Sequence, residues 1–131
     1  MPFRHSLRVR YAECDMQGIV FNAHYLAYCD DAFGAWLDAA MPGAMVYAGN
    51  DGSFDAVVKQ AVVTWHRAVR YPETVDIDCS VARWGTSSFD VRFEGSVDGR
   101  RRFDVVVTYV NVAPGTHAPA AVADDVVAAL G

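Results

Sequence analysis

The chain has 131 residues, of which 53% are hydrophobic and 21% charged, and its formal net charge at pH 7 is −5. This predicts one compact domain over residues 1–131 and argues against both a disordered chain and a nucleic-acid partner. No segment resembles a signal peptide or is apolar enough to span a membrane, and the three cysteines lack metal-ligand spacing, so we expect a cytoplasmic protein with no metal site and no membrane partner.

The first part of the chain predicts a strand followed by a long helix. Apolar and polar residues alternate in part over residues 3–12, which indicates a half-buried strand. From Leu26 to Ala40 apolar residues recur at gaps of three and four, which is typical of a helix with one buried face. Asn22 is the expected N-cap of this helix, and the Met-Pro-Gly sequence at 41–43 ends it.

The rest of the chain consists mainly of predicted strands. Their alternation or apolar content places them at residues 54–70, 75–84, 88–97 and 103–112, the last of them central. The Asp98–Gly99 pair predicts a two-residue hairpin turn. The loop at 41–53 is long enough to cover a binding site. Pro119 is expected to open a short C-terminal helix, with a frayed tail as the alternative.

These elements predict an α+β domain in which a five-stranded antiparallel sheet wraps one long helix. A single helix covers only one face of such a sheet. The other face and the sheet edges must therefore meet solvent or another subunit. We expect self-association to a homodimer or homotetramer.

Asp15 lies on the predicted loop before the long helix, and a turn containing Gly18 follows it. A carboxylate at this place can lie beside the unpaired backbone N–H groups of a helix N-terminus, an arrangement suited to chemistry on a carbonyl compound. An Asp in such a loop is more commonly a turn or cap residue that bonds its own backbone. Because Asn22 is the better cap candidate, the sequence leaves Asp15 without an obvious structural task.

The order strand, Asp-x-x-Gly, loop and helix also resembles a known family. The matching residues are Asp15, Gly18, Asn22, Tyr25 and the pair Asp30–Asp31, together with the stretches Trp65–Pro72 and Arg83–Ser88. They resemble the acyl-CoA thioesterases of the 4-hydroxybenzoyl-CoA thioesterase type, and the resemblance extends from about Phe3 to Val112. It implies the hot-dog fold and hydrolysis of an acyl-CoA substrate to a free acid and CoA, with no cofactor other than the CoA of the substrate.

The resemblance also implies roles for individual residues. The carboxylate of Asp15 would attack the thioester carbonyl or activate a water. Backbone amides from Val20 to Asn22 would polarise the thioester oxygen, with the N–H of Asn22 matching the family's donor. Some bacterial relatives carry His at the position of Asn22, so the Asn found here gives no support to a mechanism assisted by His. Gly18 would shape the turn, and Tyr25 could line the pocket or belong to the core.

The turn after Arg83, with Thr86 and Ser87, is the expected CoA-binding region, and an ordinary strand connection explains it equally well. Arg67 and Arg70 could contact phosphate or a subunit interface, and the sequence does not separate the two. Arg100–Arg102 could also bind a phosphate, although a charged hairpin tip that keeps the protein soluble is the more common explanation. Helical geometry puts Asp30 at the border of the apolar face and turns His24 and Asp31 outward.

Two other functions remain open on the same fold. The first is a non-catalytic protein that binds an acyl-CoA or another acyl ligand, since fold alone does not fix activity. The second is a hydratase that uses an Asp–His pair, for which His24 is the candidate base.

Overall fold

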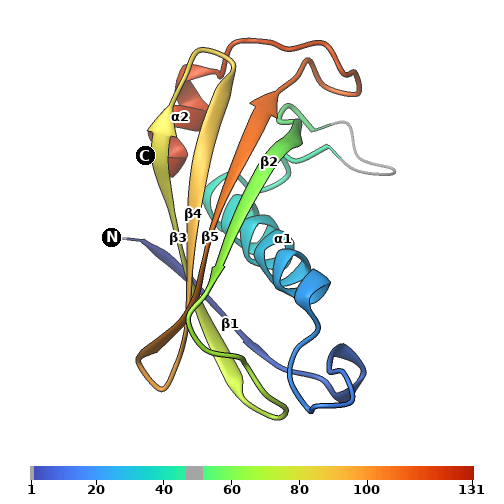
Figure 1. Cartoon of the computed structure of the whole chain (residues 1–131). Coiled ribbons are helices and arrows are strands. Elements are labelled where there is room, and N and C mark those ends of the chain that lie inside the picture. The colour runs from blue at the N-terminus through green and yellow to red at the C-terminus, as the bar shows by residue number, and fades with distance from the viewer. Residues whose placement is uncertain (1, 47–51) are drawn as a thin grey trace.

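The computed structural model describes residues 2–46 and 52–131 of the chain. Strand β1 (Phe3–Arg8) leads through a 3-10 turn (Tyr11–Glu13) into the long helix α1 (Asn22–Ala40). Four strands and a short helix follow, as Figure 1 shows: β2 (Ala56–Trp65), β3 (Thr74–Trp84), β4 (Ser88–Val97), β5 (Arg100–Asn111) and α2 (Asp124–Leu130). No helix in the described ranges is long and apolar enough to cross a membrane.

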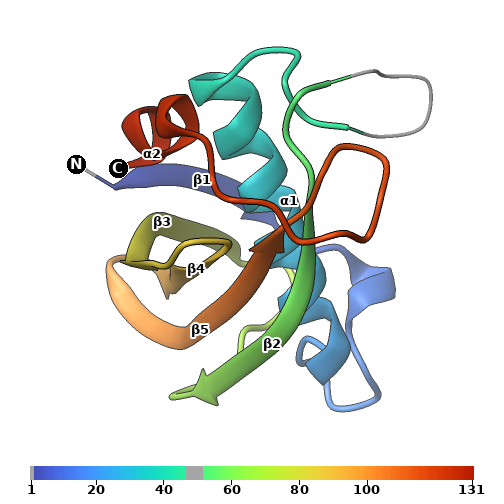
Figure 2. The same cartoon turned by 90° about the horizontal axis from the view of Figure 1, so that it is seen from above.

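The five strands form one antiparallel sheet in the order β1-β3-β4-β5-β2. Seen from above, the sheet curls around α1, which lies on its concave side (Figure 2). Strands β1 and β2 are the two edges of the sheet. The α+β arrangement predicted from the sequence, with one long helix inside a five-stranded antiparallel sheet, is therefore confirmed.

The core lies between the concave face of the sheet and α1. Alternate residues of β4, namely Phe89, Val91 and Phe93, are fully buried, and Phe33 of α1 packs against this layer. Burying these side chains supplies the main driving force for folding, at about 25 cal/mol per Å² of apolar surface removed from water. The intervening residues of the strands form a charged outer face, with ion pairs that include Arg83–Asp90 and Arg101–Glu94.

Strands β4 and β5 are joined by the predicted two-residue turn. Asp98 and Gly99 have φ angles of 52° and 77°, which lie in the left-handed region. Two successive positive φ values are what the tight hairpin turns require, and Asp-Gly is a favoured pair for them. Strands β3 and β4 begin and end within one residue of the predicted bounds.

The beginning of α1 corrects a prediction. Asn22 is the first helical residue rather than the N-cap; Phe21 takes the cap position with extended φ and ψ of −66° and 141°, and no side chain caps the helix. Leu26, expected on the buried stripe, is 38% exposed, whereas Tyr25 and Tyr28 are buried. The difference is confined to the start of the helix, since Cys29, Phe33, Trp36 and Leu37 of the predicted stripe are buried.

Other element bounds also differ from the sequence prediction. The first strand ends at Arg8, because the 3-10 turn interrupts it. The second strand spans only Ala56–Trp65 of the predicted 54–70, and α2 begins at Asp124 rather than at Pro119. Strand β5 is an interior strand, but β4 is the middle one. Part of the loop expected to cover a binding site, residues 47–51, lies outside the described residues.

Candidate functional site

Asp15 lies on an exposed turn between the 3-10 turn and α1. Its side-chain Oδ1 accepts a hydrogen bond of 2.8 Å from the N–H of Gln17, and its backbone carbonyl accepts one of 3.0 Å from the N–H of Gly18. Gly18 has a φ of +76°, a conformation that a residue with a Cβ adopts only with strain. Asp15 therefore has a structural task, which corrects the sequence analysis. Its second carboxylate oxygen has no hydrogen-bond partner within residues 2–46 and 52–131.

Two short backbone contacts fix the turn to the rest of the molecule. Cys14 forms an antiparallel bridge with Val20, and Ile19 forms one with Arg70. The N–H of Val20 donates a hydrogen bond of 2.9 Å to the carbonyl of Val69. The amide of Val20 is thus occupied by a structural bond, so we remove it from the predicted oxyanion donors.

The first amides of α1 are free to bind an anion. The N–H of Phe21 donates to the carbonyl of Glu13 at 2.9 Å, but the N–H groups of Asn22 and Ala23 have no acceptor in the described part of the chain. The first turn of a helix presents such unpaired donors together with the positive end of the helix dipole. The amide of Asn22 is therefore available for the oxyanion role that the family resemblance implies, although its side chain is not the cap.

A buried acid beside the turn was missed by the sequence analysis. The side chain of Glu13 is only 10% exposed, and both of its oxygens accept hydrogen bonds from Arg10, while Tyr28 donates to Oε1 at 2.9 Å. Burial alone would raise the pKa of Glu13, but these hydrogen bonds outweigh it and the pKa lies below its ordinary value. Burial and the bond to Glu13 raise the pKa of Tyr28.

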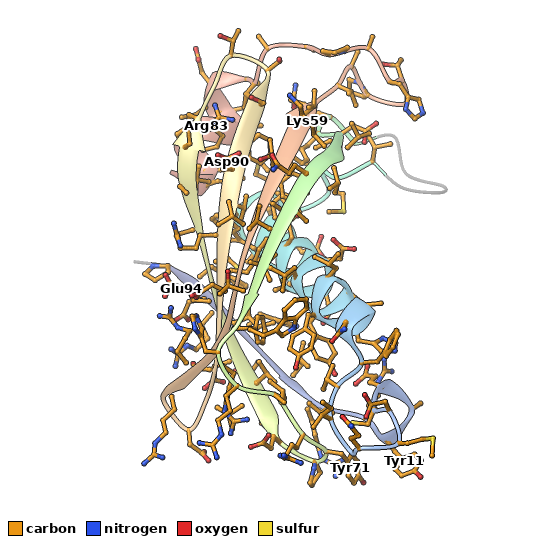
Figure 3. All side chains as sticks on the ribbon, viewed as in Figure 1. Tyr11, Lys59, Tyr71, Arg83, Asp90 and Glu94 are labelled. Carbon is orange, nitrogen blue, oxygen red and sulfur yellow. The ribbon has the colours of Figure 1, made fainter. Side chains whose placement is uncertain are left out.

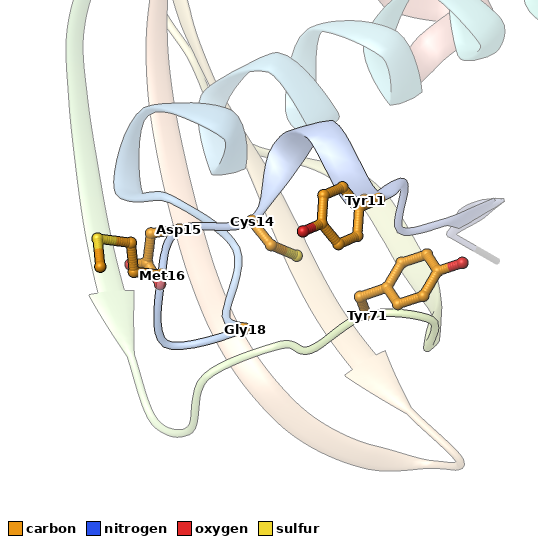
Figure 4. A pocket seen from close by; sticks show the side chains of 6 residues that line it. All are labelled: Tyr11, Cys14, Asp15, Met16, Gly18 and Tyr71. Atoms are coloured by element: carbon orange, nitrogen blue, oxygen red, sulfur yellow. The ribbon is translucent and has the colours of Figure 1, made fainter.

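A hollow of about 580 Å³, which we call the Asp15 hollow, opens beside the turn, as Figure 4 shows. It is lined by Tyr11, Cys14, Asp15, Met16, Gly18 and Tyr71. The rings of Tyr11 and Tyr71 meet edge to face at 5.9 Å, yet Tyr11 is 80% exposed and Met16 is fully exposed. Large exposed apolar side chains around a carboxylate indicate a surface that binds a partly apolar ligand.

A second hollow, of about 280 Å³, lies between α1, β2 and β5, and we call it the Tyr109 hollow. Its lining includes Asp30, Phe33, Phe54 and Tyr109, together with Met45 from the loop after α1. The hydroxyl of Tyr109 is buried and has no hydrogen-bond partner among the described residues. Burial raises the pKa values of Tyr109 and of Asp30. Alternation along β5 predicts that Tyr109 points inward, but not that its hydroxyl lacks a partner.

Tyr25 belongs to the core and not to either hollow. It is 1% exposed, its ring lies 5.0 Å from that of Phe103, and its hydroxyl oxygen accepts a hydrogen bond from the N–H of Val69. Of the two roles left open by the sequence, pocket lining and core, the structure supports the core.

The predicted CoA-binding turn lies far from Asp15 in the chain's structure. Figure 3 shows Arg83 at one end of the sheet and Tyr11 and Tyr71, which line the Asp15 hollow, at the other. The guanidinium of Arg83 is bound to Asp90 at 2.9 Å and to Ser88 at 3.1 Å.

The neighbouring carbonyls are also engaged. Those of Thr86 and Ser87 accept hydrogen bonds from the N–H groups of Val122 and Asn111. The structure does not bring these predicted residues together with Asp15 in one chain.

The histidines lie outside the Asp15 hollow. His5 contacts Asp31 at 2.8 Å and His66 contacts Asp104 at 2.7 Å, and none of the described histidines lines this hollow. Asp31 is 66% exposed, as its predicted outward direction requires. Cys14 lines the hollow, and its thiol lies 3.9 Å from the carbonyl of Arg10.

The comparison with solved structures agrees with this architecture. A gentisyl-coenzyme A thioesterase superposes with a TM-score of 0.85 at 19% identity, covering 98% of this chain and all (100%) of that one. A 1,4-dihydroxy-2-naphthoyl-CoA thioesterase from Synechocystis gives 0.83 at 16%, covering 99% and 96%. The PA5185 protein from Pseudomonas aeruginosa gives 0.84 at 23%, covering 98% and 88%. At these identities the similarity establishes the fold.

The family comparison is more specific. No curated protein matches the sequence. Residues 9–130 match the thioesterase-like superfamily, which covers nearly the whole chain. The predicted hot-dog fold is confirmed, and the chain belongs to the thioesterase-like superfamily.

Proposed function

We propose that this protein is an acyl-CoA thioesterase that hydrolyses an acyl-CoA to a free acid and CoA. One observation carries the proposal. In a chain of the thioesterase-like superfamily, an exposed carboxylate with one free oxygen, Asp15, lies on the loop that leads into a helix whose first amides, those of Asn22 and Ala23, are free. Hydrolysis of a thioester needs two groups: a nucleophile or base, and a hydrogen-bond donor for the developing oxyanion.

Two routes are compatible with this geometry. In the first, the free oxygen of Asp15 attacks the thioester carbon, CoA leaves as the thiolate, and water hydrolyses the resulting anhydride. In the second, Asp15 takes a proton from a water that attacks the same carbon, and the proton passes to the departing thiolate. In both, the N–H of Asn22 binds the oxygen that gains negative charge.

The acyl group would occupy the second hollow, lined by Phe33, Phe54 and Tyr109. Met45, from the start of the 41–53 loop, lines this hollow, which supports the proposal that the hollow takes the acyl group. Asp30, on its rim, lies eight residues beyond Asn22, or about 12 Å along the helix. The two hollows share no lining residue in one protomer, so a second copy of the chain would help to join them.

Self-association is proposed through β2. This ten-residue edge strand leaves one row of backbone N–H and C=O groups unpaired, and it exposes Val58, Val62 and Trp65 at 47–56%. Long, apolar edge strands usually pair with another chain. The same association would offer a way to bring Arg83 and its turn to the CoA bound at another copy's Asp15. Dimer or tetramer formation can be read from sedimentation equilibrium.

The strongest alternative is an acyl-CoA binding protein without catalysis. One observation favours it: Asp15 stabilises its own turn through Gln17, so a binder would also have a reason to carry this residue. A hydratase is less well supported, since the described histidines do not line the Asp15 hollow. The cytoplasmic location stays a prediction.

Thiol release from a panel of acyl-CoA substrates tests the proposal. The panel would contain saturated short, medium and long chains, benzoyl-CoA and hydroxylated aryl-CoA compounds, the last because two similar structures are named for gentisyl-CoA and dihydroxynaphthoyl-CoA. Catalytic release of CoA from any saturated or aromatic member supports the hydrolase and excludes the hydratase. Binding of acyl-CoA by calorimetry without turnover of any member would establish the binding protein instead.

A further inference from the structure

Glu13 connects the loop that carries Asp15 to the helix that carries the free amides. Its backbone carbonyl accepts the N–H of Phe21 at 2.9 Å, directly before Asn22 in the chain. Its side-chain Oε1 accepts the hydroxyl of Tyr28, on the second turn of α1, also at 2.9 Å. We propose that Glu13 is a positioning residue that holds Asp15 and the amide of Asn22 at a fixed separation; this inference rests on the proposed function.

The contact with Tyr28 has no substitute nearby. Within residues 2–46 and 52–131 it is the only side-chain hydrogen bond that joins residues 10–18 to α1. The turn from Asp15 to Gly18 is otherwise stabilised by bonds within itself and by its backbone bridges. Without the Glu13–Tyr28 bond, the loop is held to the start of α1 only by the backbone, through the Phe21–Glu13 bond and the Cys14–Val20 bridge, so the separation of Asp15 and Asn22 becomes less well defined.

The surroundings of Glu13 also keep its carboxylate a strong hydrogen-bond acceptor. The N–H of Arg10 donates to Oε1 at 2.7 Å, and the Arg10 guanidinium donates to Oε2 at 2.9 and 3.1 Å. These bonds satisfy a carboxylate that is nine-tenths buried, and they leave Oε1 directed at Tyr28. Charge-assisted hydrogen bonds of this kind are shorter and stronger than neutral ones, so they define a position well.

Catalysis is sensitive to such a separation. A displacement of about 1 Å between reacting groups can lower a rate by about 100-fold without changing which groups are present. Substrate affinity depends on the walls of the hollows, and Glu13 lines neither the Asp15 hollow nor the Tyr109 hollow. A positioning role therefore predicts a loss of kcat with little change of KM.

The test compares Tyr28→Phe and Glu13→Gln with two matched controls. Tyr28→Phe keeps the ring and removes only the hydroxyl; Glu13→Gln keeps the shape and removes the charge. The controls come from the outer face of the sheet, where Asp76 accepts a hydrogen bond from the hydroxyl of Ser6 and lies 3.8 Å from the Arg4 guanidinium. Ser6→Ala and Asp76→Asn make the same chemical changes to a carboxylate beside an arginine, outside both hollows.

We expect kcat to fall by about 10- to 100-fold in both Glu13-site variants, with KM within about twofold of wild type. Glu13→Gln keeps an oxygen that can accept from Tyr28 but loses the charge and an acceptor for the Arg10 guanidinium. The double variant should be no slower than the slower single variant, because both changes weaken the same connection between the loop and the helix. The controls should lose a similar amount of thermal stability and keep their kcat. All rates are measured at least about 20 °C below the Tm of each variant, so that partial unfolding does not lower them.

Three results would overturn the inference. A wild-type kcat in Tyr28→Phe and Glu13→Gln would show that the bond does not position the site. An equal fall of kcat in the controls would show that lost stability alone is responsible. A wild type that releases no thiol would refute the proposed function and this role together, whereas an active wild type with unaffected variants refutes the role alone.

Discussion

Replacing Asn22 by proline would delete one proposed oxyanion donor and almost nothing else. Asn22 is the first residue of α1, the position where proline is best tolerated, because its missing N–H has no intrahelical acceptor there and its fixed φ suits the helix. The residue before a proline must be extended, and Phe21 already has φ and ψ of −66° and 141°. The fold should therefore accept Asn22→Pro.

The expected magnitude follows from what this amide would bind. Removing one backbone or side-chain donor from an oxyanion site costs about 100- to 1,000-fold in kcat, or about 2.7–4 kcal/mol. The free energy of unfolding should change by no more than about 1 kcal/mol, because the N–H of Asn22 has no partner to lose in the described structure.

Steady-state thiol release and a urea unfolding curve measure both effects. Asn22→Ala, which keeps the N–H and removes the side chain, is the control and should retain activity within about threefold of wild type, since the donor worth about 100-fold or more is still present. A folded Asn22→Pro enzyme with wild-type kcat would refute the assignment of this amide. A loss of kcat in Asn22→Ala as large as in Asn22→Pro would point to the side chain instead.

Three further predictions concern the scaffold. Gly95→Ala should destabilise the domain by about 1–3 kcal/mol in urea unfolding, because a Cβ there would overlap the buried ring of Phe103; an unchanged midpoint would contradict this packing. Tyr109→Phe should stabilise the free protein by about 1 kcal/mol, since it removes a buried hydroxyl without a partner, and a loss of stability would show that the hydroxyl is bonded. Arg102 holds the pKa of Glu73 below its ordinary value, so the stability from this pair is present above that value and is lost as the pH falls through the lowered pKa. Unfolding curves from pH 6 down to about pH 2 should therefore show Glu73→Gln less stable than wild type near neutrality and equal to it in acid, whereas a constant difference would contradict the pairing.

The sheet could be predicted from the sequence because its signals are local. Alternation in β3 and β4 shows directly which residues point inward, and the Asp98–Gly99 pair marks the turn after β4. The start of α1 was predicted less well. Asn22 has the side chain of a cap, but the backbone of Phe21 takes that position because its N–H is held by Glu13.

The candidate site could be predicted only in part. Asp15, Gly18 and the amide of Asn22 could be named as candidates because they are close in the chain and carry the family resemblance. Glu13 was missed, since its partner Tyr28 is fifteen residues away and the importance of the acid lies in its burial. Tyr109 was missed because an unpaired hydroxyl depends on what surrounds it in three dimensions.

The identity of the reacting acid is the central claim, and thiol release by wild type and Asp15→Asn tests it most directly. Asparagine keeps the oxygen that accepts the N–H of Gln17, so the turn should survive while the carboxylate is lost. Asp38→Asn, an equal change at an exposed position of α1, is the control. With the best acyl-CoA of the panel, we expect Asp15→Asn to lose at least about 100-fold in kcat, the size of a general base contribution, and Asp38→Asn to match wild type. Equal turnover by folded Asp15→Asn and wild type would contradict the account.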